Sequence, residues 1–250
     1  MKPQSWQHVA TWYDTLIGEK GGYFHQNVIF PKTAKMLKLK EDQKILDLAC
    51  GQGAFCRFLH DRQLYRTGVD ASSLLIEKAK HYEEDQKTEY LVDDARTLAM
   101  LGARQFDAIV SILAIQNIDP IDGMFRRIHE LLLADGKFVF VILHPSFRSP
   151  RITGWGDDID RKLQYRRVDR YMTGMKIPIA MHPGQSQSAV TWTYHRPLED
   201  YMTALRQAQF VVDSIEEWIS PKVSVGKNAD SENLARQEIP VFMAIRALKR

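Results

Sequence analysis

Apolar runs alternate with amphipathic stretches along most of this chain, and that alternation constrains its fold more than any other feature of the sequence. The run KFVFVIL at 137–143 is almost wholly apolar, which is typical of a central strand in a parallel sheet. Helices between such strands cover both faces of the sheet. The pattern therefore predicts an α/β fold with a doubly wound, mostly parallel sheet of seven strands.

The same pattern places each element along the chain. The apolar runs predict strands at 44–48, 66–69, 89–92, 106–113, 137–143, 210–218 and 241–247. The amphipathic stretches predict helices at 54–62, 72–81, 121–133 and 198–209. Asp135-Gly136 predicts a tight turn before the fifth strand, and 221–231 predicts a polar loop.

The alternation stops at His144-Pro145, and no amphipathic helix of normal length is visible from there to Arg196. Four prolines and four glycines interrupt this stretch. A segment of this length inside a compact domain usually carries function. We therefore expect a single domain over 1–250, with an insertion at 145–196 after the fifth strand that forms a lid over a ligand.

The composition is that of an ordinary globular protein, with 44% hydrophobic residues, 26% charged residues and a net charge of +3. No apolar stretch is long enough to span a bilayer, and MKPQSWQHVA at the N-terminus has no charged-then-apolar signal region. We therefore expect a cytoplasmic protein with no membrane partner. Because Cys50 and Cys56 form neither a CxxC pair nor a zinc set, and the histidines are scattered, we expect no metal site.

The sequence DLACGQGAF at 47–55 follows the first expected strand and opens a helix. In open α/β sheets, ligands bind at this edge, where the strands have their carboxyl ends. Gly51 and Gly53 lack a Cβ atom, so the chain can turn sharply there and lie close to a ligand. Asp47 can accept a hydrogen bond from a ligand ammonium or amide. Asp70 ends the next strand 23 residues later, a spacing that suits a carboxylate on two ribose hydroxyls.

The glycine pattern argues against a dinucleotide. A dinucleotide fingerprint has a third glycine three residues after the second, and Cys56 stands there instead. A nicotinamide dehydrogenase is therefore a poor fit. An acidic strand end such as Asp47 favours a cationic ligand without phosphate.

These motifs resemble those of class I S-adenosylmethionine (SAM)-dependent methyltransferases over about 45–143. GVDAS at 68–72 and DDAR at 93–96 join the glycine motif, and FDAIVSILAIQNID at 106–119 is similar to the family's fourth strand and the segment after it. WYDTLIGEKGGYFH, within the segment 1–40, is similar to the N-terminal helical segment of many small-molecule members. The resemblance implies a Rossmann-like fold, SAM as cofactor and S-adenosylhomocysteine as product.

The resemblance also implies roles for individual residues. The residues expected to bind the cofactor are Asp47, Gly51 and Gly53 at the methionine part, Asp70 at the ribose, Asp94 and Ala95 at the adenine, and Ala114 and Gln116 beneath the sulfonium and methyl group, with Ala49 and Ala71 beside them. Tyr13 or Tyr23 is expected to close over the cofactor.

The insertion 145–196 is expected to form the acceptor pocket. Its aromatic and arginine side chains are Trp155, Tyr165, Tyr171, Trp192, Tyr194, Arg148, Arg151, Arg166, Arg167, Arg170 and Arg196. Such a lining suits a small molecule that is anionic and aromatic and accepts the methyl group on O, N or S. Methyl transfer needs a base only when the acceptor loses a proton. His144, directly after the fifth strand, is the first candidate for that base, and His195 is the second.

Three alternatives stay open. The basic stretch RKLQYRRVDR at 161–170 fits an RNA or protein methyltransferase, but it also fits a solvated face or pairing with Asp157, Asp158 and Asp160. The sequence NIDP at 117–120 does not match the NPPY-type motif of amino-group DNA methyltransferases, which argues against base methylation. A non-catalytic SAM-binding protein is a further class. Exposed aromatic residues in the insertion are equally suited to a homodimer face.

Overall fold

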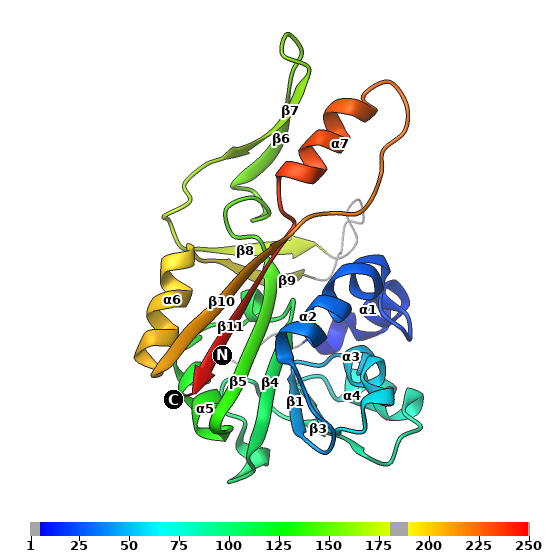
Figure 1. The fold of residues 1–250 in the computed structure, drawn as a ribbon, viewed down its shortest axis with the longest axis vertical. Helices are drawn as coiled ribbons and strands as arrows, with labels where there is room; N and C mark the ends of the chain where they lie inside the picture. The colour runs from blue at the N-terminus through cyan, green and yellow to red at the C-terminus, as the bar shows by residue number, and fades with distance from the viewer. Residues whose placement is uncertain (1–5, 181–189, 250) are drawn as a thin grey trace.

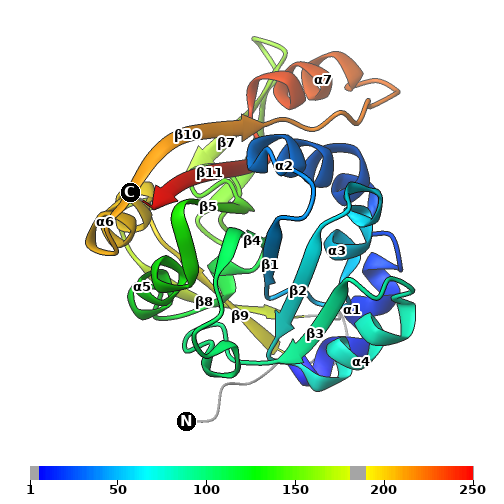
Figure 2. The same ribbon diagram turned by 60° about the horizontal axis from the view of Figure 1, so that its bottom comes forward.

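A computed structural model describes residues 6–180 and 190–249 and has a seven-stranded sheet at its centre (Figures 1 and 2). The strands lie in the order β10-β11-β5-β4-β1-β2-β3. Their bounds are β1 Lys44–Leu48, β2 Tyr65–Asp70, β3 Thr88–Val92, β4 Phe106–Ile112, β5 Leu132–Leu143, β10 Phe210–Trp218 and β11 Phe242–Lys249. β11 is antiparallel to β5 and β10, and the other pairs are parallel. The predicted α/β, Rossmann-like sheet of seven mostly parallel strands is confirmed.

Helices cover both faces of this sheet. Their bounds are α1 Ala10–Ile17, α2 Phe30–Leu37, α3 Ala54–Phe58, α4 Ser73–Tyr82, α5 Asp122–Leu131, α6 Leu198–Gln207 and α7 Ala229–Glu238. Side chains along β5 alternate between the two faces. Phe138 and Phe140 belong to the core under α5 and α6, whereas Val139 and Val141 belong to the core under α2 and α3. The apolar run that predicted a central strand is therefore buried on both sides.

The boundary between α5 and β5 differs from the prediction. We expected a helix to 133, a tight turn at Asp135-Gly136 and a strand from 137, but β5 already begins at Leu132. Asp135-Gly136 forms an irregularity within β5 instead of a turn before it. Asp135 has a φ of +60°, and a Cβ atom on Gly136 would lie 2.7 Å from the Leu133 carbonyl oxygen. The register against β4 shifts at the same place.

The segment between β10 and β11 also differs from the prediction. The expected polar loop at 221–231 overlaps the start of α7, which the sequence pattern did not reveal. Ala235 is the one residue of this helix that is fully buried. A helix with so little apolar surface lacks the periodicity from which helices are predicted.

The described part of the 145–196 insertion forms two antiparallel hairpins, which pair β6 (Thr153–Asp158) with β7 (Leu163–Val168) and β8 (Met175–Ala180) with β9 (Val190–His195). α7 packs against β7, and the three elements β6, β7 and α7 project from the sheet as an arm (Figure 1). The β8–β9 hairpin lies between the arm and the sheet (Figure 1). The insertion thus has two separate parts.

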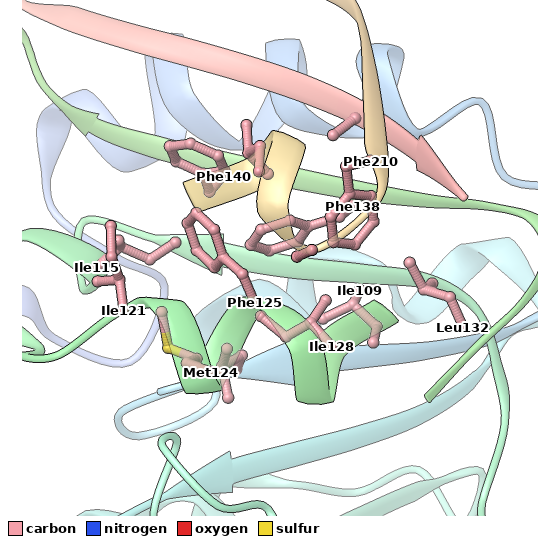
Figure 3. Close-up of a cluster of buried hydrophobic side chains, with 14 of the residues drawn as sticks. Ile109, Ile115, Ile121, Met124, Phe125, Ile128, Leu132, Phe138, Phe140 and Phe210 are labelled. Atoms are coloured by element: carbon pink, nitrogen blue, oxygen red, sulfur yellow. The ribbon is translucent and has the colours of Figure 1, made fainter. Parts of the chain in front are cut away.

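The core predicts a first stability test. Figure 3 shows Phe125 of α5 beside Phe138 and Phe140, and its ring centroid lies 5.5 and 5.8 Å from theirs. Because Phe125→Ala empties this buried position, we expect the free energy of unfolding to fall by about 3–5 kcal/mol. Urea denaturation measures the loss. Met100→Ala, at a side chain that is 64% exposed, is the control and should change the value by less than about 0.5 kcal/mol. Equal losses in the two variants would contradict this account of the core.

Candidate functional site

The loop after β1 has an unusual backbone. Ala49, Gly51 and Gly53 have φ values of +58°, +57° and +79°. A Cβ atom on Gly53 would lie 2.4 Å from the hydroxyl oxygen of Tyr90, so both the backbone angle and the space require glycine. Ala49 adopts the left-handed conformation without being glycine, which is strain of the kind found at ligand sites. This loop turns directly at the carboxyl edge of the sheet.

Asp47 lies in β1, two residues before the loop, and is buried. The hydrogen bond it receives comes from the Cys56 thiol, with Sγ 3.7 Å from Oδ2, and no basic side chain in the described residues pairs with it. Burial raises the pKa of Asp47 to about 7, and the nearby charge of Asp70 acts in the same direction. A buried carboxyl with so weak a donor suits a ligand that brings a cation.

Asp70 ends β2 and fixes the glycine loop. Its carboxylate accepts hydrogen bonds from the backbone N–H of Gly51 at 3.0 Å and of Ser72 at 2.8 Å. Burial raises the pKa of Asp70, and these backbone donors act in the opposite direction. Ser72 in turn caps α4 by accepting from the N–H of Leu75. The two acids from neighbouring strands therefore meet at one edge.

Asp93 and Asp94 follow β3. Asp93 is buried and accepts from the N–H groups of Asp94 and Met100 at 2.8 and 2.9 Å. The predicted adenine neighbour Asp94 instead turns its carboxylate to Arg96, which holds the pKa of Asp94 below its usual value. Ala95 is partly buried against the core. Asp94 and Ala95 thus follow β3 at the same edge as Asp70, and their place beside an adenine stays a prediction.

Gln116 carries an unsatisfied buried atom. The chain after β4 turns at Leu113, which has a φ of +54°, and continues through Ala114 into the short helical turn Ile115–Asn117. The side-chain amide of Gln116 donates to the Leu113 carbonyl oxygen at 2.8 Å, while its Oε1 is buried without a hydrogen-bond partner. Buried acceptors in folded proteins nearly always have a donor. Gln116 is therefore poised to accept from a ligand.

The N-terminal helical segment covers this edge. Tyr13 of α1 lies against the glycine loop, since a Cβ atom on Gly51 would be 3.3 Å from its ring. Burial, Asp70 and Asp47 raise the pKa of Tyr13 far above its usual value. The amide of Gln52 donates to the carbonyl oxygen of Gly18 at 3.0 Å and holds the segment in place. Of the two predicted tyrosines, Tyr13 is the one beside the site.

Tyr23 lies elsewhere. It is 47% exposed, and its ring contacts Phe24 and the ammonium group of Lys222. Phe24 in turn packs on Phe242 of β11. Phe242 pairs with Leu143 at the carboxyl end of β5, so Tyr23 lies near the start of β11, and no contact between Tyr23 and the glycine loop is seen among the described residues. The expectation that Tyr23 closes over the cofactor stays a prediction.

The β8–β9 hairpin closes over the end of β4. Thr193 of β9 donates to the side-chain oxygen of Asn117 at 2.9 Å, and Arg196 donates to the carbonyl oxygen of Ile118 and to Asp119. The ammonium group of Lys176 lies 4.2 Å from the centre of the Trp192 ring. The sequence pointed to Gln116-Asn117 at the end of the fourth strand but not to Thr193, because the bond between Thr193 and Asn117 joins segments 76 residues apart.

Neither histidine proposed as a base has a free ring nitrogen. The Nε2 of His144 lies 2.6 Å from Glu217 Oε1, and its Nδ1 accepts from the N–H of Ser146. Burial lowers the pKa of His144, although Glu217 acts in the opposite direction. His195 Nε2 donates to the Tyr171 carbonyl oxygen at 2.7 Å, and Nδ1 lies 2.8 Å from the Ser149 hydroxyl. His144 joins the end of β5 to β10, and His195 joins β9 to the loop after β5.

The polar groups at this edge are mostly acceptors: two buried carboxylates and one unpaired amide oxygen. Such a set fits a ligand that brings positive charge and hydrogen-bond donors, and it repels a pyrophosphate. SAM carries a sulfonium, an ammonium group and two ribose hydroxyls, so the residues present fit it. No group of three potential metal ligands occurs in the part of the chain that the structure describes.

Comparisons with known proteins agree with this geometry. Residues 46–140, from β1 into β5, match the methyltransferase domain family. Over 107 residues the chain is 28% identical to a ubiquinone biosynthesis O-methyltransferase of Coxiella burnetii. That alignment covers 42% of this chain and 45% of the relative, so the chain spans about half the length of this curated relative.

Two solved structures share the fold. An S-adenosylmethionine-dependent methyltransferase of Mesorhizobium loti has a TM-score of 0.68 and 28% identity, over 87% of this chain and 96% of that one. A protein of Listeria monocytogenes assigned to the same class has a TM-score of 0.71 and 22% identity, over 88% and 98%. Among the helices of residues 6–180 and 190–249, none combines the length and apolar character that a membrane crossing requires.

The raised pKa of Asp47 predicts how stability depends on pH. The folded protein, with a pKa of about 7, binds a proton that the unfolded chain, near 3.8, has lost. This carboxyl therefore makes the ligand-free protein less stable as pH rises from about 4 to about 7, with no further change above. Asp47→Asn removes the effect. We expect it to raise the free energy of unfolding at pH 8 by on the order of 2–4 kcal/mol and to change it little at pH 4.

Urea denaturation of wild type and variant at both pH values provides the test. Asp42→Asn changes the same charge at a carboxyl that is 75% exposed and is the matched control. A gain from Asp47→Asn that is equal at pH 4 and pH 8 would show that Asp47 has an ordinary pKa.

Proposed function

We propose that this chain, which belongs to the class I SAM-dependent methyltransferases, transfers the methyl group of SAM to a small-molecule acceptor. The observation that carries the proposal is the convergence of Asp47, Asp70 and the unpaired oxygen of Gln116 on one edge of the sheet, under Tyr13. When bound there, SAM supplies a methyl group on a positively charged sulfur.

Each residue of the edge has a proposed task. Asp47 binds the ammonium group of the methionine part, with the loop Ala49–Gly53 close beside it. Asp70 binds the ribose hydroxyls, since its position is fixed by backbone donors, with Ala71 next to it. Asp94 and Ala95 flank the adenine. Tyr13 covers the cofactor and excludes water, which strengthens the electrostatic interactions beneath it.

The acceptor enters between the end of β4 and the β8–β9 hairpin. Ala114 and Gln116 are proposed to lie where the methyl group faces the acceptor. Gln116 Oε1 is proposed to accept a hydrogen bond from the acceptor molecule. Lys176, Trp192 and Tyr194 lie together on the face of the hairpin opposite Thr193, and we propose that they form an aromatic and cationic wall at the rim of the acceptor space. This wall is suited to an anionic aromatic molecule.

The transfer is proposed to proceed without a side-chain base. Both ring nitrogens of His144 and His195 are engaged with protein groups, so neither can take a proton without breaking a structural bond. The acceptor's lone pair forms the new bond to the methyl carbon as the carbon–sulfur bond breaks. Any proton that the acceptor carries passes to water. The protein contributes alignment and exclusion of bulk solvent.

The basic stretch 161–170 does not by itself favour an RNA substrate. Side chains alternate along β7, so the basic stretch 161–170 does not form one continuous face. Arg167 pairs with Asp169 at 3.0 Å, and Arg166 turns toward Trp155. A phosphate-tracking surface needs several unpaired cations side by side.

Calorimetry of SAM and S-adenosylhomocysteine tests the cofactor site. We expect wild-type protein to bind both, and Asp70→Ala to weaken binding by about 1–3 kcal/mol because a charged hydrogen-bond partner is lost. Asp42→Ala, at an exposed carboxyl, should leave the affinity unchanged. Binding of NAD in place of both ligands would overturn the assignment.

Transfer of radiolabelled methyl groups from SAM to a panel of hydroxybenzoates and aminobenzoates, which are anionic and aromatic and keep a hydrogen-bond donor, tests the reaction. We expect Gln116→Ala to lower kcat at least tenfold, because the acceptor loses the hydrogen bond that orients it and a rise of about 1.4 kcal/mol in the activation free energy slows the reaction tenfold. The affinity for SAM should stay nearly unchanged. Gln105→Ala, at an exposed glutamine, is the matched control. SAM binding without transfer to any acceptor would favour a non-catalytic SAM-binding protein.

A further inference from the structure

Two arginines contact one indole at the base of the arm, and a third arginine lies near one of them. The guanidinium carbons of Arg148 and Arg166 each lie 4.9 Å from the centre of the Trp155 ring. Arg148 is in the loop between β5 and β6, and Arg166 is opposite Trp155 in the β6–β7 hairpin. Arg236 of α7 is close enough to act on Arg148 electrostatically. None of these residues has a role in the proposed cofactor site.

The cluster lacks neutralising charge. In residues 6–180 and 190–249, no carboxylate pairs with Arg148 or Arg166, and Arg236 has only Glu232 at 3.8 Å. Burial and the charges of Arg166 and Arg236 lower the pKa of Arg148 to about 10. Half-buried guanidinium groups of this kind are normally paired with an acid or a phosphate.

Neutral carbonyl groups hold these side chains in place. Arg148 donates to the carbonyl oxygens of Pro240 and Ile239, at 3.1 and 3.2 Å. Arg166 donates to the carbonyl oxygen of Phe147 and to the hydroxyl of Thr153. These hydrogen bonds orient the two guanidinium groups but do not neutralise their positive charge. The two guanidinium groups are therefore preorganised beside an indole that is 42% exposed, and both arginines are only partly buried.

A continuous path of contacts joins this cluster to the end of β4. Ser149, next to Arg148, bonds to His195 of β9, and Thr193 of the same strand bonds to Asn117 beside Gln116. Thr193 and His195 are two residues apart, or about 7 Å along a strand. With a contact at each end, the arginines lie on the order of 15 Å from Gln116.

We propose that Arg148 and Arg166 form a phosphate-binding site that anchors an elongated acceptor, whose methyl-accepting atom reaches the end of β4. The statement about the acceptor rests on the proposed function, whereas the phosphate site itself does not. Trp155 packs against the ligand next to the phosphate. The substrate class is a small molecule with a terminal phosphate or diphosphate separated from the methylated atom by on the order of 15 Å.

The test is a titration with sodium phosphate and sodium pyrophosphate at constant ionic strength. The readout is the NMR signal of the Trp155 indole N–H, assigned with Trp155→Phe. We expect saturable shifts in the wild type and at least tenfold weaker pyrophosphate binding in Arg166→Gln. The matched control is Arg167→Gln, since Arg167 is the next residue of the same strand and its side chain is 64% exposed. Equal weakening in both variants, or no saturable shift in the wild type, would overturn the site.

A second variant guards against an effect on folding. Arg148→Lys keeps the charge but removes the planar fork that donates to two oxygens at once. We expect at least threefold weaker pyrophosphate binding with an unchanged unfolding midpoint. Unchanged pyrophosphate binding in this variant would remove Arg148 from the site.

Two further experiments distinguish failure of the phosphate site from failure of the proposed function. Calorimetry of SAM on the same variants should give wild-type affinity. If pyrophosphate binds at Trp155 but SAM does not bind, the proposed function fails and the phosphate site stands. If SAM binds and pyrophosphate does not, the site fails alone. A short single-stranded RNA that binds more tightly than pyrophosphate, and depends equally on Arg166, would overturn the small acceptor in favour of a nucleic-acid backbone.

Discussion

The hydrogen bond from the backbone N–H of Gly51 to the carboxylate of Asp70 is the interaction on which the candidate site depends. It ties the left-handed loop after β1 to the end of β2, and a parallel bond from Cys50 N–H to the Val69 carbonyl oxygen supports it. The next residues cap α4 through Ser72, whose hydroxyl donates to Gln7 of the N-terminal segment. One fixed carboxylate thereby sets the positions of the loop, the helix and the cover.

In the ligand-free protein, the burial of Asp47 and Asp70 is electrostatically unfavourable. Burial raises the pKa values of both Asp47 and Asp70, which means that their charged forms are poorly solvated. A structure optimised for stability alone would replace them with apolar groups. A bound cation beside Asp47 and hydrogen-bond donors beside Asp70 would offset this cost, which is consistent with the proposed cofactor.

The sequence predicted what depends on short-range order. β1 and β10 have the bounds expected from apolar periodicity, and the positions of Gly51 and Asp70 followed from strand ends. Features set by tertiary packing escaped prediction. Tyr13 and Tyr23 are equivalent as residue types in one segment, and only packing directs Tyr13 to the site. The partners of His144 and His195 lie 73 and 46 residues away along the chain, and no periodicity reports such distances.

The two hairpins of the insertion are held in place by contacts that its sequence did not indicate. β9 is outside both the central sheet and the arm, yet its buried side chains bond to the turn after β4 and to Ser149 in the loop that leads into the arm. A short hairpin is marginally stable alone, so these bonds, together with those of Arg196, must hold it in place. The wall of the acceptor space and the arginine cluster are consequently supported by the same strand. Displacing β9 would disturb both at once, which makes the insertion one mechanical unit although its two hairpins form separate sheets.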